Sequence, residues 1–378
     1  NLEELGEAGA AALAAFYAER ARNGVALLVS GGYAPNPEGR MKAGPGYFND
    51  FAQLPAHTPI TTAVHEAGGR ILLQILHSGR YGMHGDIVAP SPIKAPISRT
   101  VPRELSHADI LRTIDDYCRC AELAVAAGYD GCEIMGSEGY LISQFCAPRT
   151  NQRDDAWGGS ADKRRRFALE VTSAVRAALG PKRLLAFRLS VLDLVEGGMA
   201  WAEIAALAQA LEAAGVDLLS TGIGWHESPV PTVQQVVPPA LFSSAVAPLK
   251  DVVTIPVCAS NRITTPALAN ELIAQGQTDL VALARPLLAD PAFVRKAQRG
   301  EDHTIVPCIA CNQACLDHYF TGAQVSCMVN PRCGHELDAD FALHPTPSPR
   351  RVAVVGAGPA GLAVAATAAQ RGHQVQVF

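Results

Sequence analysis

Short apolar runs alternate with longer amphipathic stretches along the first 300 residues. Runs that are apolar almost throughout are typical of parallel strands covered on both faces, whereas longer stretches with helical spacing of apolar residues are typical of surface helices. The predicted strands are Val25–Ser30, Ile71–Leu76, Tyr129–Met135, Leu184–Ser190, Asp217–Thr221, Thr254–Ser260 and Asp279–Arg285.

The amphipathic stretches between these runs predict the helices. They are Ala8–Arg22, Thr58–Ala67, Ser106–Ala127, Asp162–Leu179, Trp201–Ala214, Ala240–Lys250, Thr265–Gln275 and Pro291–Arg299. Regular alternation without a break in composition favours a (β/α)₈ TIM barrel, with an open doubly wound sheet as the alternative. Because the chain opens on a helix, we expect the first barrel strand to lie upstream of Asn1.

The pattern changes after residue 300. A cysteine-rich stretch is followed by His344-Pro-Thr-Pro-Ser-Pro-Arg350, which is typical of a stiff linker, and then by a strand, a glycine-rich turn, a helix and a strand. We therefore predict a barrel over 1–305, a cluster segment over 306–343, a linker over 344–350 and the start of a dinucleotide-binding domain over 351–378. Since such a domain needs further strands, the chain is expected to be a fragment.

Four cysteines have the spacing of a metal site. Cys308, Cys311 and Cys315 are followed by Cys327. Structural zinc sites usually pair two Cys-x-x-Cys turns, whereas three close thiolates plus one distant thiolate favour an iron–sulfur cubane. We predict a 4Fe–4S cluster, with zinc as the alternative and Cys333 as a second candidate for the fourth ligand. The other cysteines are expected to be ordinary buried thiols of a reducing, cytoplasmic compartment.

The glycine-rich turn reads Val354-Val-Gly356-Ala-Gly358-Pro-Ala-Gly361. It lies between a predicted strand and a predicted helix, as a dinucleotide-binding turn requires, because glycines let the backbone approach a pyrophosphate at the helix N-terminus. The motif alone does not distinguish FAD from NAD(P).

Polar residues and glycines follow the carboxyl ends of the predicted barrel strands, where the active sites of this fold lie. Three arginines among them favour an anionic ligand, such as a phosphate or a reduced flavin. The set comprises Gly31, Gly32, Gln74, His77, Glu138, Tyr140, Arg188, His226, Asn261, Arg262 and Arg285.

Bulk properties exclude some partners. The 378 residues are 48% hydrophobic with a net charge of −5, which argues against nucleic acid as a main partner. No apolar run reaches the length of a membrane span.

Together these residues resemble the bacterial 2,4-dienoyl-CoA reductases and related NADH:flavin oxidoreductases of the old yellow enzyme superfamily. The resemblance covers the whole chain, and its main departure is Phe145-Cys-Ala-Pro148, which puts fine substrate shape in doubt. It is carried by the cysteine cluster, GAGPAG, Leu27–Gly32, Gln74–Arg80, Gly136–Gln144, Arg149–Arg166, Gly222–Glu227 and Ala282–Asp290.

The resemblance implies an FMN site in the barrel. Gln74 would meet the pyrimidine edge, Arg188 would stabilise negative charge on the reduced ring, and Arg285 would bind the phosphate. The full implied set is Gly32, Gln74, Arg188, Arg262, Ala284 and Arg285 for FMN, with Gly356, Gly358 and Gly361 for FAD.

The resemblance also implies a catalytic pair, Tyr140 and His226, with Glu138 nearby and with Arg149 and His226 meeting an acyl-CoA substrate. The implied reaction is the NADPH-dependent reduction of 2,4-dienoyl-CoA to enoyl-CoA in the β-oxidation of unsaturated fatty acids, with electrons passing from NADPH through FAD and the 4Fe–4S cluster to FMN. A tyrosine is protonated at neutral pH, since its ordinary pKa is near 10, and can donate a proton with help from His226.

Three alternatives stay open. An enoate reductase or an amine dehydrogenase could share the same modules, although a tyrosine–histidine pair suits proton delivery to an alkene better than amine oxidation. A zinc-stabilised barrel acting as a binding protein is the alternative of a different class. The acyl-chain range, the choice between NADPH and NADH, and the oligomeric state do not follow from the sequence.

Overall fold

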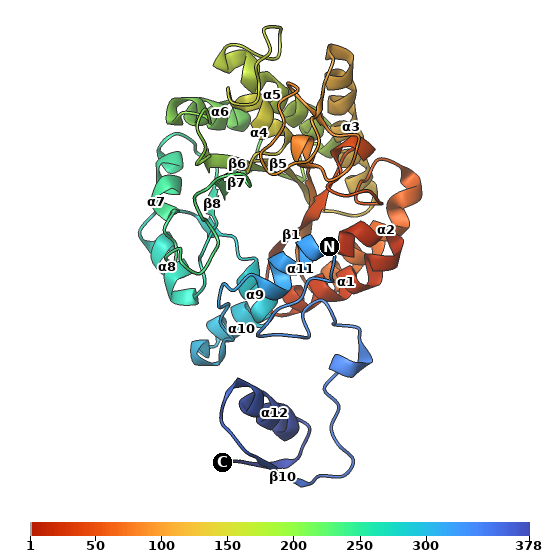
Figure 1. Cartoon of the computed structure of the whole chain (residues 1–378), viewed down its shortest axis with the longest axis vertical. Helices are drawn as coiled ribbons and strands as arrows, with labels where there is room; N and C mark the ends of the chain where they lie inside the picture. The colour runs from red at the N-terminus through yellow and green to blue at the C-terminus, as the bar shows by residue number, and fades with distance from the viewer. Residues whose placement is uncertain (1) are drawn as a thin grey trace. The chain divides into compact units, whose positions relative to one another are not determined.

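Seven strands form one parallel sheet in the computed structural model, which describes residues 2–378 (Figure 1). All seven predicted runs contribute a strand, so this prediction is confirmed. The strands, in their spatial order, are β1 Leu27–Tyr33, β2 Arg70–Ile75, β5 Gly131–Gly136, β6 Leu184–Leu192, β7 Leu218–Ile223, β8 Val257–Ala259 and β9 Leu280–Val281. The two-residue strands β3 Val88–Ala89 and β4 Arg103–Glu104 pair separately.

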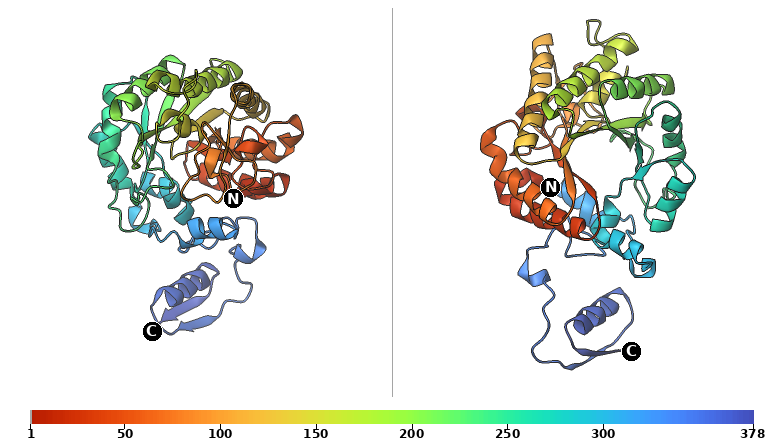
Figure 2. Two further views of the ribbon diagram at one scale, coloured as in Figure 1. Left: turned by 45° about the horizontal axis from the view of Figure 1, so that its top comes forward. Right: turned by 180° about the vertical axis from the view of Figure 1, so that it is seen from behind.

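The sheet curls, and its helices lie on the outside of the curl (Figures 1 and 2). This arrangement is that of a barrel rather than of a doubly wound sheet, whose helices cover both faces. The curl is open, with β1 and β9 at its two edges, and the expected eighth strand is not among the described residues. The helices are α1 Glu7–Arg22, α2 Leu54–Glu66, α3 His107–Ala126, α4 Leu141–Cys146, α5 Ala161–Leu179, α6 Trp201–Ala213, α7 Ser243–Val246, α8 Pro266–Ala274, α9 Arg285–Ala289 and α10 Phe293–Gln298.

Local sequence explains where these helices begin and end. Ser106 accepts a hydrogen bond from the backbone of Asp109 in a capping box that starts α3. The predicted helix 240–250 is instead the short α7 followed by a 3₁₀ turn, Ala247–Asp251. Pro248 explains the break, because proline lacks the N–H of an α-helical hydrogen bond and clashes with the preceding turn. The short helices α4 and α9 were not predicted.

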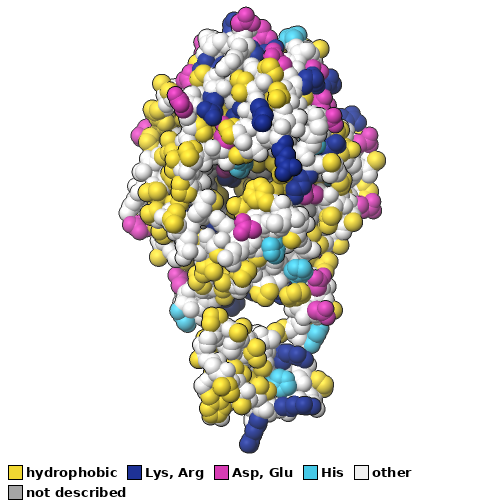
Figure 3. All heavy atoms as spheres, in the orientation of Figure 1, with side chains coloured by type: hydrophobic (Ala, Val, Ile, Leu, Met, Phe, Trp, Pro, Cys, Tyr) yellow, Lys and Arg dark blue, Asp and Glu magenta, His cyan; other side chains and the backbone are white. Residues whose placement is uncertain are grey.

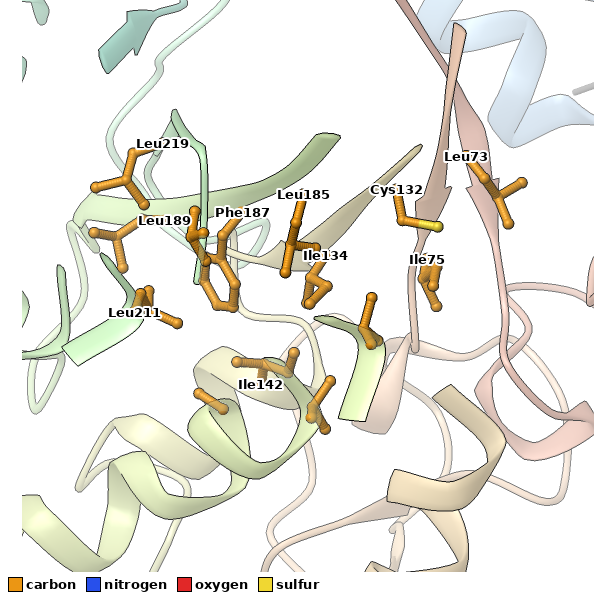
Figure 4. Packing of buried hydrophobic residues seen from close by; sticks show 14 of the residues in the cluster. Leu73, Ile75, Cys132, Ile134, Ile142, Leu185, Phe187, Leu189, Leu211 and Leu219 are labelled. Atoms are coloured by element: carbon orange, nitrogen blue, oxygen red, sulfur yellow. The ribbon is translucent and has the colours of Figure 1, made fainter. Parts of the chain in front are cut away.

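Alternation along the strands sorts apolar from polar side chains. In Figure 4, Ile134, Leu185 and Phe187 point toward Ile142 on α4, and all four belong to the main hydrophobic core. Because successive strand residues face opposite sides of a sheet, the residues that alternate with these along each strand face the inside of the curl. Those positions include Arg188, and the strands thereby present polar groups to the interior.

The chain divides into two compact units, Asn1–Gly334 and His335–Phe378. The second unit contains β10 Arg351–Val354, α12 Pro359–Gln370 and β11 Gln374–Val377, with β10 parallel to β11. Its glycine motif lies between β10 and α12, as predicted. A Cβ on Gly361 would lie 1.9 Å from the carbonyl oxygen of Gly356, so this turn requires glycine. The predicted boundaries at 305, 343 and 350 stay predictions. Within the described residues, no helix is both long and apolar enough to cross a membrane.

Candidate active site

A buried carboxylate organises the polar interior of the curl. Glu133 on β5 is 3% exposed and accepts hydrogen bonds from Gln74 Nε2 at 2.7 Å and from Ser220 Oγ at 2.5 Å. The backbone N–H of Gln74 in turn donates to Ser30 Oγ at 3.0 Å. Glu133 and Ser220 were not predicted, although a lone polar residue in an apolar strand is the signal that marks them.

Arg188 supplies a cation next to this network. Its Nη2 donates to Glu138 Oε1 at 2.8 Å, while its buried Nε has no hydrogen-bond partner among the described residues. Backbone packing is close nearby, because a Cβ on Gly32 would lie 2.7 Å from the Cβ of Leu76. An amide, a cation with a free donor and a glycine in one place fit the polar edge of a flavin ring, so the residues present fit FMN. The surface is hollowed where the strands curl around this region (Figure 3).

The loop after β5 carries an unusual backbone conformation. Glu138 has φ 60° and Gly139 has φ 85°, both in the left-handed region. A non-glycine residue there is uncommon and often marks a functional loop. This turn directs the Glu138 carboxylate to Arg188 and places Tyr140 at the start of α4.

Tyr140 and His226 lie side by side although 86 positions separate them in the sequence. Their ring centroids are 4.9 Å apart with the planes at 70°, and the backbone N–H of His226 donates to the backbone carbonyl oxygen of Glu138 at 3.2 Å. Burial raises the pKa of Tyr140, and the Glu138 carboxylate adds to this rise. Burial lowers the pKa of His226, although Glu138 opposes the shift. At neutral pH the pair is therefore a phenol beside a neutral imidazole.

Arg149 is connected to the catalytic pair by Glu227, the residue that follows His226. Arg149 Nε donates to Glu227 Oε1 at 2.8 Å, and Arg80 Nη2 and the Tyr81 hydroxyl donate to Oε2 at 2.6 and 2.9 Å. Arg80, Tyr81 and Glu227 received no predicted role. Their signal in the sequence is faint, because a charged residue beside His226 is also expected on a solvated loop.

The remaining predicted FMN residues lie in other surroundings. Arg262 has φ 60°, and its Nε donates to the carbonyl oxygen of Val237 at 2.9 Å. Ala284 caps α9, and Arg285 begins it. The Arg285 guanidinium turns toward the cysteine segment, where Nη1 donates to Asn312 Oδ1 at 2.7 Å.

The four predicted cluster ligands line one cavity together with Arg285 and Asn312. The lining thiols are those of Cys308, Cys311, Cys315 and Cys327, and each of these cysteines is half-buried. Burial raises the pKa of the Cys315 and Cys327 thiols. Within residues 2–378, no group of three or more His, Cys, Asp or Glu side chains is arranged to hold a metal ion.

Cys333 has a different environment. It is 1% exposed, and Arg20 Nη2 approaches its sulfur at 3.8 Å. Arg20 Nε also donates to the carbonyl oxygen of Leu287 on α9 at 3.2 Å. Cys333 therefore packs against α1 and is not a lining residue of the four-cysteine cavity.

Residues 3–303 match the model of the NADH:flavin oxidoreductase / NADH oxidase family. The chain belongs to this family. Its members are flavin-dependent oxidoreductases, so the FMN-compatible groups described above lie in a flavin oxidoreductase barrel.

Similar proteins show the range of reactions within the NADH:flavin oxidoreductases. A metal reductase of Desulforamulus reducens is 40% identical over 368 residues, which are 96% of this chain and 54% of that protein. An N,N-dimethylglycine/sarcosine dehydrogenase of Chromohalobacter salexigens is 32% identical, covering 96% of this chain and 54% of that protein. A solved 2-naphthoyl-CoA reductase in complex with 2-naphthoyl-CoA superposes with a TM-score of 0.94 at 33% identity, covering 97% of this chain and 58% of that one. The chain spans about half the length of the curated relatives it matches.

Proposed function

We propose that this NADH:flavin oxidoreductase reduces a conjugated acyl-CoA thioester, with 2,4-dienoyl-CoA as the expected substrate and NADPH as the electron donor. The observation that carries the proposal is the pairing of Tyr140 with His226 beside the Glu138–Arg188 ion pair. The structural similarity to a 2-naphthoyl-CoA reductase in complex with its CoA thioester supports the same substrate class.

In this proposal the residues of the site divide the work of alkene reduction. FMN bound here would supply the hydride, and Gln74 and Arg188 would hold the polar edge of its ring. Tyr140, whose phenol is protonated at neutral pH, donates the proton to the substrate carbon. The neutral His226 lies against the phenol and assists the transfer. Arg149, with a side chain 31% exposed, provides positive charge at the rim for an acyl-CoA.

We further propose that the two remaining modules deliver electrons from NADPH. Four half-buried thiols around one cavity support a 4Fe–4S cluster on Cys308, Cys311, Cys315 and Cys327. The close packing at Gly361 supports a pyrophosphate-binding turn for FAD. Thiols that are all free in the described structure fit a reducing cytoplasmic location.

Amine oxidation is the rival reaction, and a dehydrogenase of N,N-dimethylglycine and sarcosine is among the relatives. The electrostatics of Tyr140 favour alkene reduction. Because burial and the neighbouring carboxylate raise its pKa, the Tyr140 phenol stays protonated at neutral pH, so it has a proton to donate to an alkene and is not available as a base. An enoate reductase would use the same acid, so the thioester itself must be tested.

The test uses the full-length protein, purified without oxygen and reduced with NADPH. Its absorption spectrum should show flavin, and analysis should find iron and sulfide. The reduced protein is mixed in turn with 2,4-dienoyl-CoA and with the free dienoic acid. In a separate experiment the oxidised protein is mixed with N,N-dimethylglycine. Fast reoxidation by the thioester supports the proposal. Reaction with the free acid alone identifies an enoate reductase, and reduction of the oxidised protein by the amine identifies an amine dehydrogenase.

A further inference from the structure

Glu227 is a buried carboxylate that the proposed chemistry does not use. Its side chain is 1% exposed, and Arg80, which binds it, has a side chain that is 2% exposed. Three donors converge on the two carboxylate oxygens: the guanidinium groups of Arg80 and Arg149 and the hydroxyl of Tyr81. A buried carboxylate is costly unless it is paired and hydrogen-bonded, and here all its partners come from distant parts of the chain.

The partners of Glu227 surround the catalytic pair. Tyr81 meets Tyr140 edge to face at 6.1 Å between ring centroids and meets His226 edge to face at 5.8 Å. With the 4.9 Å contact between Tyr140 and His226, the three rings form a closed aromatic triangle. Glu227 is the residue directly after His226, so a fixed carboxylate also fixes the backbone that carries the imidazole.

The hydroxyl groups of Tyr81 and Tyr140 differ in their hydrogen bonding. The Tyr81 hydroxyl donates a hydrogen bond to Glu227 Oε2, whereas the Tyr140 hydroxyl makes no hydrogen bond to a described residue. Tyr81 therefore contributes a ring held at a fixed angle, and Tyr140 keeps a free O–H. On a packed triangle of rings, a shift of one member displaces the other two.

We infer that Glu227 is a positioning residue: it holds Tyr81 against Tyr140 and His226 and holds Arg149 at the rim, so that the acid and the substrate meet in one geometry. This role rests on the proposed reduction of an acyl-CoA thioester. In this role the Glu227 carboxylate controls both the specificity for the thioester, through Arg149, and the alignment of the acid, through Tyr81. Misplacement of a reacting group by about 1 Å can cost on the order of 100-fold in rate, so alignment alone can carry a large effect.

Two substitutions test the role in the full-length enzyme. Glu227→Gln keeps the volume and one acceptor oxygen but removes the charge that binds both arginines. Tyr81→Phe keeps the ring and removes only the hydrogen bond to Glu227. The control is Tyr129→Phe, which removes another buried tyrosine hydroxyl, one bonded at 3.0 Å to His57 Nδ1; Tyr129 precedes β5, whereas Tyr140 follows the other end of that strand.

The first measurement is reoxidation of the reduced enzyme by 2,4-dienoyl-CoA. We expect the rate constant to fall about 10- to 100-fold in Glu227→Gln and less in Tyr81→Phe, with FMN content and reduction by NADPH unchanged. Glu227→Asp should recover part of the rate, because it restores the charge. Wild-type rates in both Glu227→Gln and Tyr81→Phe, or losses no larger than in Tyr129→Phe, would refute the positioning role.

The second measurement needs no substrate. NMR titration of His226, assigned with His226→Gln, reports its environment; the groups facing it are Tyr81, Tyr140, Glu138 and Arg188. In Glu227→Gln, loosened packing should admit water and move the pKa of His226 back toward its ordinary value. An unchanged titration would overturn the inference. If the wild type fails to react with any CoA thioester, the proposed function fails, and this titration still decides whether Glu227 positions the rings.

Discussion

Tyr140→Phe tests the central chemical step most directly. The substitution removes one hydroxyl and keeps the ring, so the edge-to-face contacts with Tyr81 and His226 are preserved. Because the hydroxyl makes no hydrogen bond to a described residue, phenylalanine leaves no buried partner unpaired. The free energy of unfolding should therefore change by less than about 1 kcal/mol.

The expected loss of rate is far larger than this change in stability. A positioned general acid contributes roughly 10²- to 10⁴-fold, which corresponds to about 2.7 to 5.5 kcal/mol of activation free energy. His226→Gln should give a related loss. The double variant should lose less than the product of the two single losses, because residues that act as a unit are not additive.

The assay is rapid mixing of pre-reduced enzyme with 2,4-dienoyl-CoA, in which only the substrate step is observed. Reduction by NADPH is the internal control, since it needs no proton from Tyr140. In the wild type, burial keeps the acid-side break of His226 below pH 6.5, and His226→Gln should remove that break. If Tyr140→Phe reoxidises at the wild-type rate, the tyrosine is structural and His226 is the next candidate for the acid.

Three further predictions concern the cluster, acid stability and Arg285. Cys327→Ser should lose iron and sulfide, whereas Cys333→Ser should retain both, because the Cys333 sulfur lies against Arg20 and not in the cysteine cavity. The reverse result would show that the fourth ligand is Cys333. Burial lowers the pKa of His57 and of His77 to about 3, so the unfolded chain binds more protons between pH 6.5 and 3. Denaturant titrations should therefore show the free energy of unfolding decreasing as the pH is lowered through that window, by up to about 1.4 kcal/mol per pH unit for each histidine, and His57→Gln should show a shallower slope. Arg285→Gln removes the cation that lines the cysteine cavity, so the midpoint potential of the cluster should become more negative. The potential is measured by EPR during a redox titration. An unchanged potential would show that Arg285 does not influence the cluster and would leave only its predicted role in binding FMN.

Local patterns sufficed for the sheet strands and the long helices of both units. Runs such as Leu184–Ser190 are apolar at most positions, and this pattern alone identified all seven strands of the sheet. The glycine motif identified its strand and helix in the same way, because only glycine fits at Gly361. The limits of α7 were missed, since the apolar pattern of 240–250 outweighed the effect of Pro248.

Which side chains meet was decided by the tertiary structure. Arg80 and Glu227 are 147 positions apart in the sequence, and only the curl of the sheet brings their loops to one place. The same holds for Arg285, which the resemblance places on a phosphate and which the fold directs to Asn312 in the cysteine segment. The sequence by itself determined the seven sheet strands, the long helices and the chemical types at the strand ends, because these depend on local backbone preference and on burial. The tertiary structure alone decided the partners of each charged group, because a buried charge is stabilised only by groups that the fold carries to it.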